Sequence, residues 1–167
     1  MKKYEFTGET KIVGLQGRIV TLHKIRAIKD FGSVKTEDLG GWIEKEENLS
    51  HENNAWVGDE ACVGGNAWVR DNAWVGGNAC VGGNARACGN AEIFSTSHIL
   101  TIGAIGSRND FTTFYRDKYN QISVNCGCFT GKIEEFLEAV TQTHGNSKHA
   151  QVYRAAAEVA KLQIELD

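Results

Sequence analysis

The segment from Ile102 to Asp110 holds the residue types best suited to bind a ligand. Its two glycines let backbone amides approach a bound group, and its serine and asparagine offer neutral hydrogen bonds. Its arginine offers a planar fork that fits phosphate or carboxylate. This composition predicts a site for a small anionic ligand, with a nucleotide or cyclic nucleotide favoured. The predicted ligand-binding residues are Gly103, Gly106, Ser107, Arg108 and Asn109.

Two residues further along the chain extend this hypothesis. Tyr115 would add a stacking surface and Arg116 a second cation, both from the strand expected to follow the segment. The alternative is a structural turn in which Arg108 pairs with Asp110, because short loops of glycine, serine and arginine are common. Both interpretations stay open at the level of sequence.

Cysteine chemistry is less well supported. Cys126 and Cys128 could each supply a nucleophilic thiol, but no residue nearby in sequence is an evident base for either. No catalytic residue and no cofactor are therefore predicted. The protein is expected to bind its ligand without converting it, although turnover stays an alternative.

The charge pattern excludes several classes of partner. The formal net charge is −3, which gives no electrostatic basis for coating nucleic acid. Residues 1–36 carry eight Lys or Arg against three acids, and residues 37–60 carry one Lys against eight acids, so these two segments are expected to meet. No apolar run has the length of a membrane span or of a secretory signal. We therefore expect no nucleic-acid or membrane partner, and a cytoplasmic protein with reduced cysteines.

A six-residue repeat must position these groups. From Asn54 the chain reads NAWVGD, EACVGG, NAWVRD, NAWVGG, NACVGG, NARACG and NAEIFS. The second position is always Ala and the fourth is Val, Ala or Ile. The alternation predicts short strands with positions two and four facing inward, and three such hexads would close one coil of about 18 residues.

The repeat weakens at both ends. Downstream, the phase continues through residues 96–107, where Ser97/Ile99 and Gly103/Ile105 would fill the two inward positions. Upstream, Ile43 and Leu49 fall in the alanine phase, so the coils are expected to begin near Gly41. The sequence thus predicts about three to four coils over residues 41–107.

The repeat resembles the hexapeptide-repeat superfamily of left-handed β-helices, whose signature is an aliphatic residue followed four positions later by a small one, as in Val57 and Ala61. The resemblance implies a mainly β fold built on a left-handed parallel β-helix. It also implies a homotrimer, or a higher multiple, with parallel solenoids. Many members are acyl-CoA-dependent acyltransferases with a histidine near the coils, for which His98 and His51 are the available residues. Others are zinc carbonic anhydrases, but the H-x4-H pair His144 and His149 lies outside the repeat.

Outward-facing residues 18 apart should form columns on the coils. The columns are Trp56, Trp74 and Glu92; then Cys62, Cys80 and His98; then Ser50, Trp68 and Arg86. Large apolar groups on such faces need a cover, either the chain's own termini or neighbouring subunits. We predict an oligomer interface at Trp56, Trp68, Trp74, Cys62, Cys80 and Arg86. A zinc site on the Cys62 column is the less favoured alternative, because stacked side chains do not converge tetrahedrally, and no metal is predicted.

The flanks complete the predicted architecture. Residues 1–40 are expected to form a strand-rich cap, and residues 108–167 a small ββαα module. The module would contain a hairpin of Phe111–Arg116 and Ile122–Cys128, a helix opening at Thr130-Gly131 and ending at His144-Gly145, and a second helix after Ser147.

As a whole the chain resembles small hexapeptide-repeat proteins of phages and prophages, from its KYEFTGET start to its GSRNDFTTFY…CGCF…EEF ending. That resemblance implies an anti-defence role, in which an oligomer sequesters a nucleotide signal at its subunit boundaries without enzymatic turnover. An acyl-CoA-dependent acyltransferase is the first alternative. A structural or protein-binding solenoid is the second.

Overall fold

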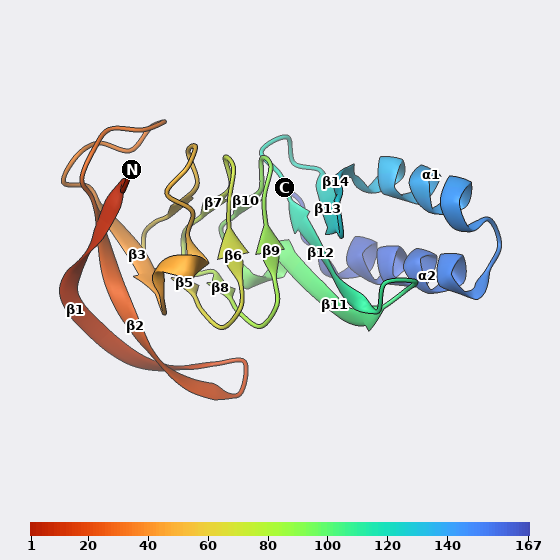
Figure 1. Ribbon diagram of the computed structural model, residues 1–167, viewed down its shortest axis with the longest axis horizontal. Helices are drawn as coiled ribbons and strands as arrows, with labels where there is room; N and C mark the ends of the chain where they lie inside the picture. The colour runs from red at the N-terminus through yellow and green to blue at the C-terminus, as the bar shows by residue number, and fades with distance from the viewer.

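The computed structural model describes residues 1–167 and is mainly β, with two helices at one end. Figure 1 shows an elongated arrangement. A long N-terminal hairpin lies at one end, short strands on stacked coils lie in the middle, and the two helices cover the other end. Neither helix is long and apolar enough to cross a membrane.

Eight short strands in the middle form three stacks of parallel strands. One stack joins β4, β7 and β10, the second β3, β5 and β8, and the third β6 and β9. From β4 onward the partners within a stack lie 18 positions apart, as in the pairing of Trp56 with Trp74, so the chain visits each stack in turn. The strands are β3 (Leu39–Ile43), β4 (Trp56–Val57), β5 (Cys62–Val63), β6 (Trp68–Val69), β7 (Trp74–Val75), β8 (Cys80–Val81), β9 (Arg86–Ala87) and β10 (Glu92–Ile93).

The predicted inward positions of the repeat are confirmed. Every alanine at position two and every residue at position four is buried, and together they form the core between the stacks. Small side chains are needed because the three stacks lie close around one axis, where interiors are packed at crystal-like density. These residues are Ala55, Ala61, Ala67, Ala73, Ala79, Ala85, Ala91, Val57, Val63, Val69, Val75, Val81, Ala87 and Ile93.

Corners of successive coils are tied together by acidic side chains. The carboxylate of Asp59 accepts a hydrogen bond from the amide of Gly77 at 2.7 Å, and Asp71 accepts one from Gly89 at 2.9 Å. Gly77 has a φ of +58° there, a conformation that favours glycine. The G-G and R-D pairs of the repeat are therefore corner residues.

The first coil differs from the prediction. Ile43 pairs with Val63, and Leu49 with Val69, so both occupy the valine position of a coil that is two residues longer than the others. The placement of Ile43 and Leu49 in the alanine phase was wrong. The extra residues lie between Leu49 and Ala55, because the spacing from Ile43 to Leu49 is still six. Ser50 is consequently shifted out of the column of Trp68 and Arg86.

The last coil also ends earlier than predicted. Parallel pairing stops at β10, and β11 (Ile99–Ile105) runs antiparallel to β12 (Asp110–Arg116) instead of continuing a stack. The assignment of residues 96–107 to two further hexads was therefore wrong. The physical reason is that Leu100, Ile102 and Ile105 pack against the core under the helices and not against the coil axis.

The predicted strand-rich N-terminal segment is confirmed as the long hairpin of β1 (Tyr4–Leu15) and β2 (Arg18–Ala27). Strand β2 pairs with β3, so the hairpin extends the stack of β3, β5 and β8. The basic and acidic segments meet within the chain, since Lys24 and Lys11 both pair with Glu60, at 3.3 and 3.7 Å. These exposed pairs orient the hairpin and contribute little stability individually.

The C-terminal module contains four strands and not the predicted two. The order β11-β12-β13-β14 is antiparallel throughout, with β13 (Ile122–Cys126) and β14 (Phe129–Lys132). The predicted hairpin and both helices, α1 (Ile133–His144) and α2 (Lys148–Gln163), are present. The predicted opening of the first helix at Thr130-Gly131 was wrong, because both residues pair with β13 as part of β14. Phe114, Phe136 and Tyr153 join sheet and helices through edge-on ring contacts.

Candidate functional site

The turn between β11 and β12 carries the predicted ligand-binding arginine beside a cavity. Ser107 and Arg108 line a cavity of about 270 Å³, whose other walls come from α1, α2 and the turn between β13 and β14. Arg108 is exposed and forms no hydrogen bond or ion pair within the chain. Arg108 is the one lysine or arginine that lines this cavity.

Two glycines shape this cavity. A Cβ atom at position 106 would lie 2.0 Å from Cζ of Tyr153, so the turn packs directly on that ring. A Cβ atom at position 127 would lie 3.1 Å from Nε of Arg108, so the arginine stem lies across Gly127. Gly106 thus lets the turn that carries Arg108 pack on Tyr153. The role suggested by the sequence, in which Gly106 lets a ligand approach the backbone, stays a prediction.

Histidine 144 faces the predicted serine. The Nε2 atom of His144, in the last turn of α1, lies 3.5 Å from Oγ of Ser107. Ser107, Arg108 and His144 therefore form a polar edge of the cavity. The sequence suggested no role for His144 beyond its H-x4-H spacing to His149. Its position at the end of an amphipathic helix that must cover the sheet is the signal that could have indicated this contact.

The structure does not bring Tyr115 and Arg116 to this cavity. Tyr115 is buried beneath the coils, where its hydroxyl lies 3.4 Å from Sγ of Cys88 and burial raises its pKa. Arg116 donates to the carboxylate of Asp167 at 2.7 Å. The strand places Arg116 roughly 20 Å from the turn, at about 3.3 Å per residue. A stacking ring and a second cation are therefore absent from the Arg108 edge.

The remaining residues of the segment have structural positions. Asn109 has a φ of +49° and its amide closes the turn by donating to the carbonyl of Gly106 at 3.2 Å. Gly103 packs against Phe111, where a Cβ atom would lie 2.6 Å from the ring. Asp110 pairs with Arg86 at 3.5 Å and not with Arg108, so the proposed pairing of neighbours in the turn is wrong.

The outward residues of the coils fall into two groups. Trp56 and Cys62 are buried by the chain itself, the first against Phe31 and the second against the N-terminal hairpin. The other four residues keep accessible surface: Trp68, Trp74, Cys80 and Arg86. Trp68 also stacks on Arg70, with 3.9 Å between Cζ of the arginine and the centre of the ring. Only this second group offers surface to another subunit.

The histidines next to the coils are engaged. His98 accepts a hydrogen bond from the amide of Phe94 at 3.0 Å through Nδ1, and His51 accepts one from Lys3 and stacks on Tyr4 at 4.2 Å. Burial lowers the pKa of both imidazoles. His98 lies in a short 3-10 turn and does not continue the column of Cys62 and Cys80, so the three do not form the column that the sequence suggested. The chain has no group of three or more potential metal ligands.

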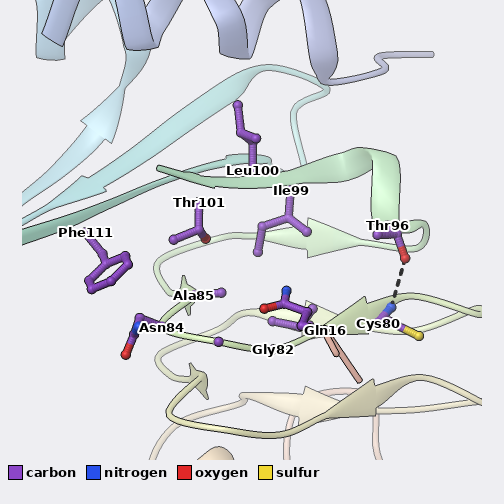
Figure 2. Close-up of a pocket in the computed structure, with 12 residues that line it drawn as sticks. Gln16, Cys80, Gly82, Asn84, Ala85, Thr96, Ile99, Leu100, Thr101 and Phe111 are labelled. Atoms are coloured by element: carbon purple, nitrogen blue, oxygen red, sulfur yellow. Dashed lines mark hydrogen bonds between the residues drawn. The ribbon is translucent and has the colours of Figure 1, made fainter. Parts of the chain in front are cut away.

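A second hollow, of about 340 Å³, runs beside the coils (Figure 2). Ile99 and Thr101 of β11 point toward the coils across it, and Gln16 reaches it from the tip of the N-terminal hairpin. The amide of Cys80 donates to Oγ1 of Thr96 at 3.1 Å at one end. No charged side chain lines this hollow, so it suits a neutral, extended group.

Comparison with known proteins gives one partial match. The chain is 36% identical over 64 residues to a protein described as the uncharacterized acetyltransferase YdcK of Escherichia coli (strain K12). The match covers 36% of this chain, which spans only 20% of the length of that relative. No protein-family model matches the chain.

Proposed function

We propose that this chain is a binding protein that holds a small anionic ligand at Arg108 without converting it. The observation that carries the proposal is an arginine with no partner of its own at the edge of a cavity. An unpaired guanidinium presents its full set of donors to carboxylate or phosphate, so ligand binding loses no internal ion pair. Ser107 and His144 would supply the remaining hydrogen bonds.

The scaffold that we propose is a left-handed parallel β-helix of the hexapeptide class, assembled as a homotrimer in the cytoplasm. The 18-residue register and the three stacks support the helix. The accessible Trp68 and Trp74 support the oligomer, since aromatic residues are enriched at the buried centre of interfaces. In the sequestering role suggested by the resemblance to phage proteins, one chain would offer one cavity, and the oligomer several.

The test is a thermal-shift screen of nucleotides, cyclic nucleotides and inorganic phosphate. A ligand at 100 times its dissociation constant should stabilise the fold by about 2.7 kcal/mol. Arg108→Ala should remove the shift, while Arg18→Ala, an exposed arginine on the distant hairpin, should keep it. Recovery of the unaltered ligand from the complex would support binding without turnover. A shift that survives Arg108→Ala would refute the assignment of the site.

Acetyl transfer is a second candidate, and the partial match to an acetyltransferase favours it. The uncharged hollow beside the coils could accept the neutral arm of an acyl carrier, such as the one in acetyl-CoA. In this case the protein should release free CoA from acetyl-CoA in the presence of an acceptor. The Nδ1 atoms of His98 and His51 each accept a backbone hydrogen bond, which argues against either histidine as the base. Release of CoA would count against the binding proposal.

A further inference from the structure

The Arg108 cavity is apolar everywhere except along one edge. Its helix and sheet walls are aromatic rings, aliphatic side chains and thiols, some of them buried: Cys126, Cys128, Phe129, Phe136, Ala139, Val140 and Tyr153. Phe136 and Phe129 lie 5.7 Å apart between ring centres and form the inner wall. Transfer of an apolar group from water into such a space is favourable in proportion to the area buried.

The polar groups lie together at the opposite edge. Arg108 is held over Gly127, and the neighbouring Ser107 hydroxyl lies 3.5 Å from Nε2 of His144. Thr143 adds one hydroxyl in the same last turn of α1. A ligand that fills this cavity therefore meets one cation and a few neutral donors at one end, and hydrocarbon at the other.

The lining also limits the kind of head group. It contains no Asn, Gln, Asp or Glu, so the amide and carboxylate side chains that pair with the edges of adenine and cytosine are absent. Arg108 is the one side chain of the lining that is always cationic, and its fork fits a single carboxylate with one negative charge. The volume of about 270 Å³ is also below the range of roughly 300–1,000 Å³ that is typical of drug-sized ligands.

We propose that the cavity binds an aliphatic monocarboxylate, with the carboxylate on Arg108 and the hydrocarbon chain against Phe129, Phe136 and Val140. This inference rests on the proposed function, because it names the chemical class of the anion that Arg108 holds. The planar guanidinium pairs with a carboxylate through two parallel hydrogen bonds. Each methylene group added to the chain buries further apolar surface until the cavity is full.

The experiment is a calorimetric titration of the full chain with butanoate, hexanoate and octanoate, and with 1-hexanol and inorganic phosphate. Affinity should rise about fourfold per added methylene, the equivalent of about 0.8 kcal/mol. The rise should stop once the chain is longer than the cavity. Hexanoate should bind at least about tenfold more tightly than 1-hexanol, because only the carboxylate can pair with the guanidinium.

Two variants test the two ends of the site separately. Arg108→Ala should weaken hexanoate binding at least about tenfold and leave 1-hexanol binding unchanged, since the head group alone is lost. Ala139→Leu, on the half-buried face of α1, should shorten the chain length at which affinity stops rising. Arg18→Ala should bind every ligand as the wild type does.

The outcomes separate this inference from the proposed function. Binding of phosphate or nucleotides that depends on Arg108, without binding of carboxylates, would overturn the monocarboxylate and leave the anion site standing. Equal binding of hexanoate and 1-hexanol would overturn the role of the head group. Binding of no anion in an Arg108-dependent way would overturn both proposals.

Discussion

At the scale of single residues, Gly106 shows how packing fixes the turn that carries Arg108. Its φ is +73°, and the ring of Tyr153 lies where a Cβ atom would be. We predict that Gly106→Ala destabilises the fold by about 2–5 kcal/mol, the sum of backbone strain and overpacking. Thermal and urea denaturation measure the effect.

Gly17 is the matched control for this substitution. It also has a positive φ, of +79°, but no atom lies within 4 Å of a Cβ atom there. Gly17→Ala should therefore carry only the strain term of about 1–2 kcal/mol. Equal losses in the two variants would show that the contact with Tyr153 contributes nothing.

His98 gives a prediction about pH. Burial, followed by the charge of Arg116, lowers its pKa in the folded state below the value of about 6.5 in the unfolded chain. Between those two pKa values the unfolded chain binds more protons, so stability is full above about pH 6.5 and falls as the pH drops toward the folded pKa.

Replacing His98 with asparagine should remove that dependence. His98→Asn keeps an acceptor for the amide of Phe94 but does not titrate. The loss of melting temperature from about pH 7.5 to about pH 5.5 should be smaller in the variant than in the wild type. His51, whose pKa is also lowered by burial, is present in both proteins, so the difference isolates His98. Parallel pH profiles would contradict this account.

The candidate site was only half predictable at this scale. Residue types alone indicated Arg108 and Ser107, because both lie in one short turn and need no distant partner. Whether Tyr115 and Arg116 would join them depends on strand direction, and a strand moves consecutive residues away from the turn. His144 comes from a helix that meets the turn only through tertiary packing, so its spacing in sequence carried no information about this contact.

At the scale of elements, the coil of 18 residues governs what can be deleted. Residues 64–81 span one full coil, and their removal would join Val63 to Gly82 with every later strand on its original stack. We predict that this deletion still folds cooperatively with a similar circular dichroism spectrum, because each coil contacts mainly its neighbours.

Deletion of residues 64–69 is the sensitive comparison. Removing a single hexad would move every later strand to a different stack and turn the C-terminal module relative to the N-terminal hairpin. It should lower the melting temperature more than the deletion that is three times as long, since Arg70 would take the place of Gly64, where a Cβ atom would lie 2.7 Å from Cδ2 of Leu15, whereas the longer deletion places Gly82 there. A smaller loss for the shorter deletion would contradict the three-stack arrangement.

Regular and irregular elements differed in how well the sequence predicted them. The central hexads were predictable because each repeats the same inward alanine and valine. The two ends were not, for physical reasons that the pattern does not contain. Two extra residues between Leu49 and Ala55 shift the pairing of the first coil with the second, while the spacing from Ile43 to Leu49 stays at six. At the other end, the apolar residues of β11 are buried by α2, which begins only at Lys148, far later in the chain.

At the scale of the whole molecule, the chain buries some of the outward coil faces by itself. The N-terminal hairpin covers Cys62, and the segment after it covers Trp56. Trp68 and Trp74 stay partly accessible on the remaining faces. The molecule thus has covered faces next to its hairpin and uncovered aromatic faces elsewhere, which limits where another copy could pack.

These uncovered faces carry the prediction of assembly. Sedimentation equilibrium at micromolar protein should give three times the chain mass, because a closed symmetric ring buries the same face of every copy. Trp68→Ala should weaken association at least about thirtyfold, the equivalent of the roughly 2 kcal/mol of an interface hot spot. Ile19→Ala, an exposed residue on the hairpin outside the predicted interface, should leave the mass unchanged. A wild-type mass equal to one chain would contradict this interface and would mean that the contacts of Trp68 lie within its own chain, among them its stacking on Arg70.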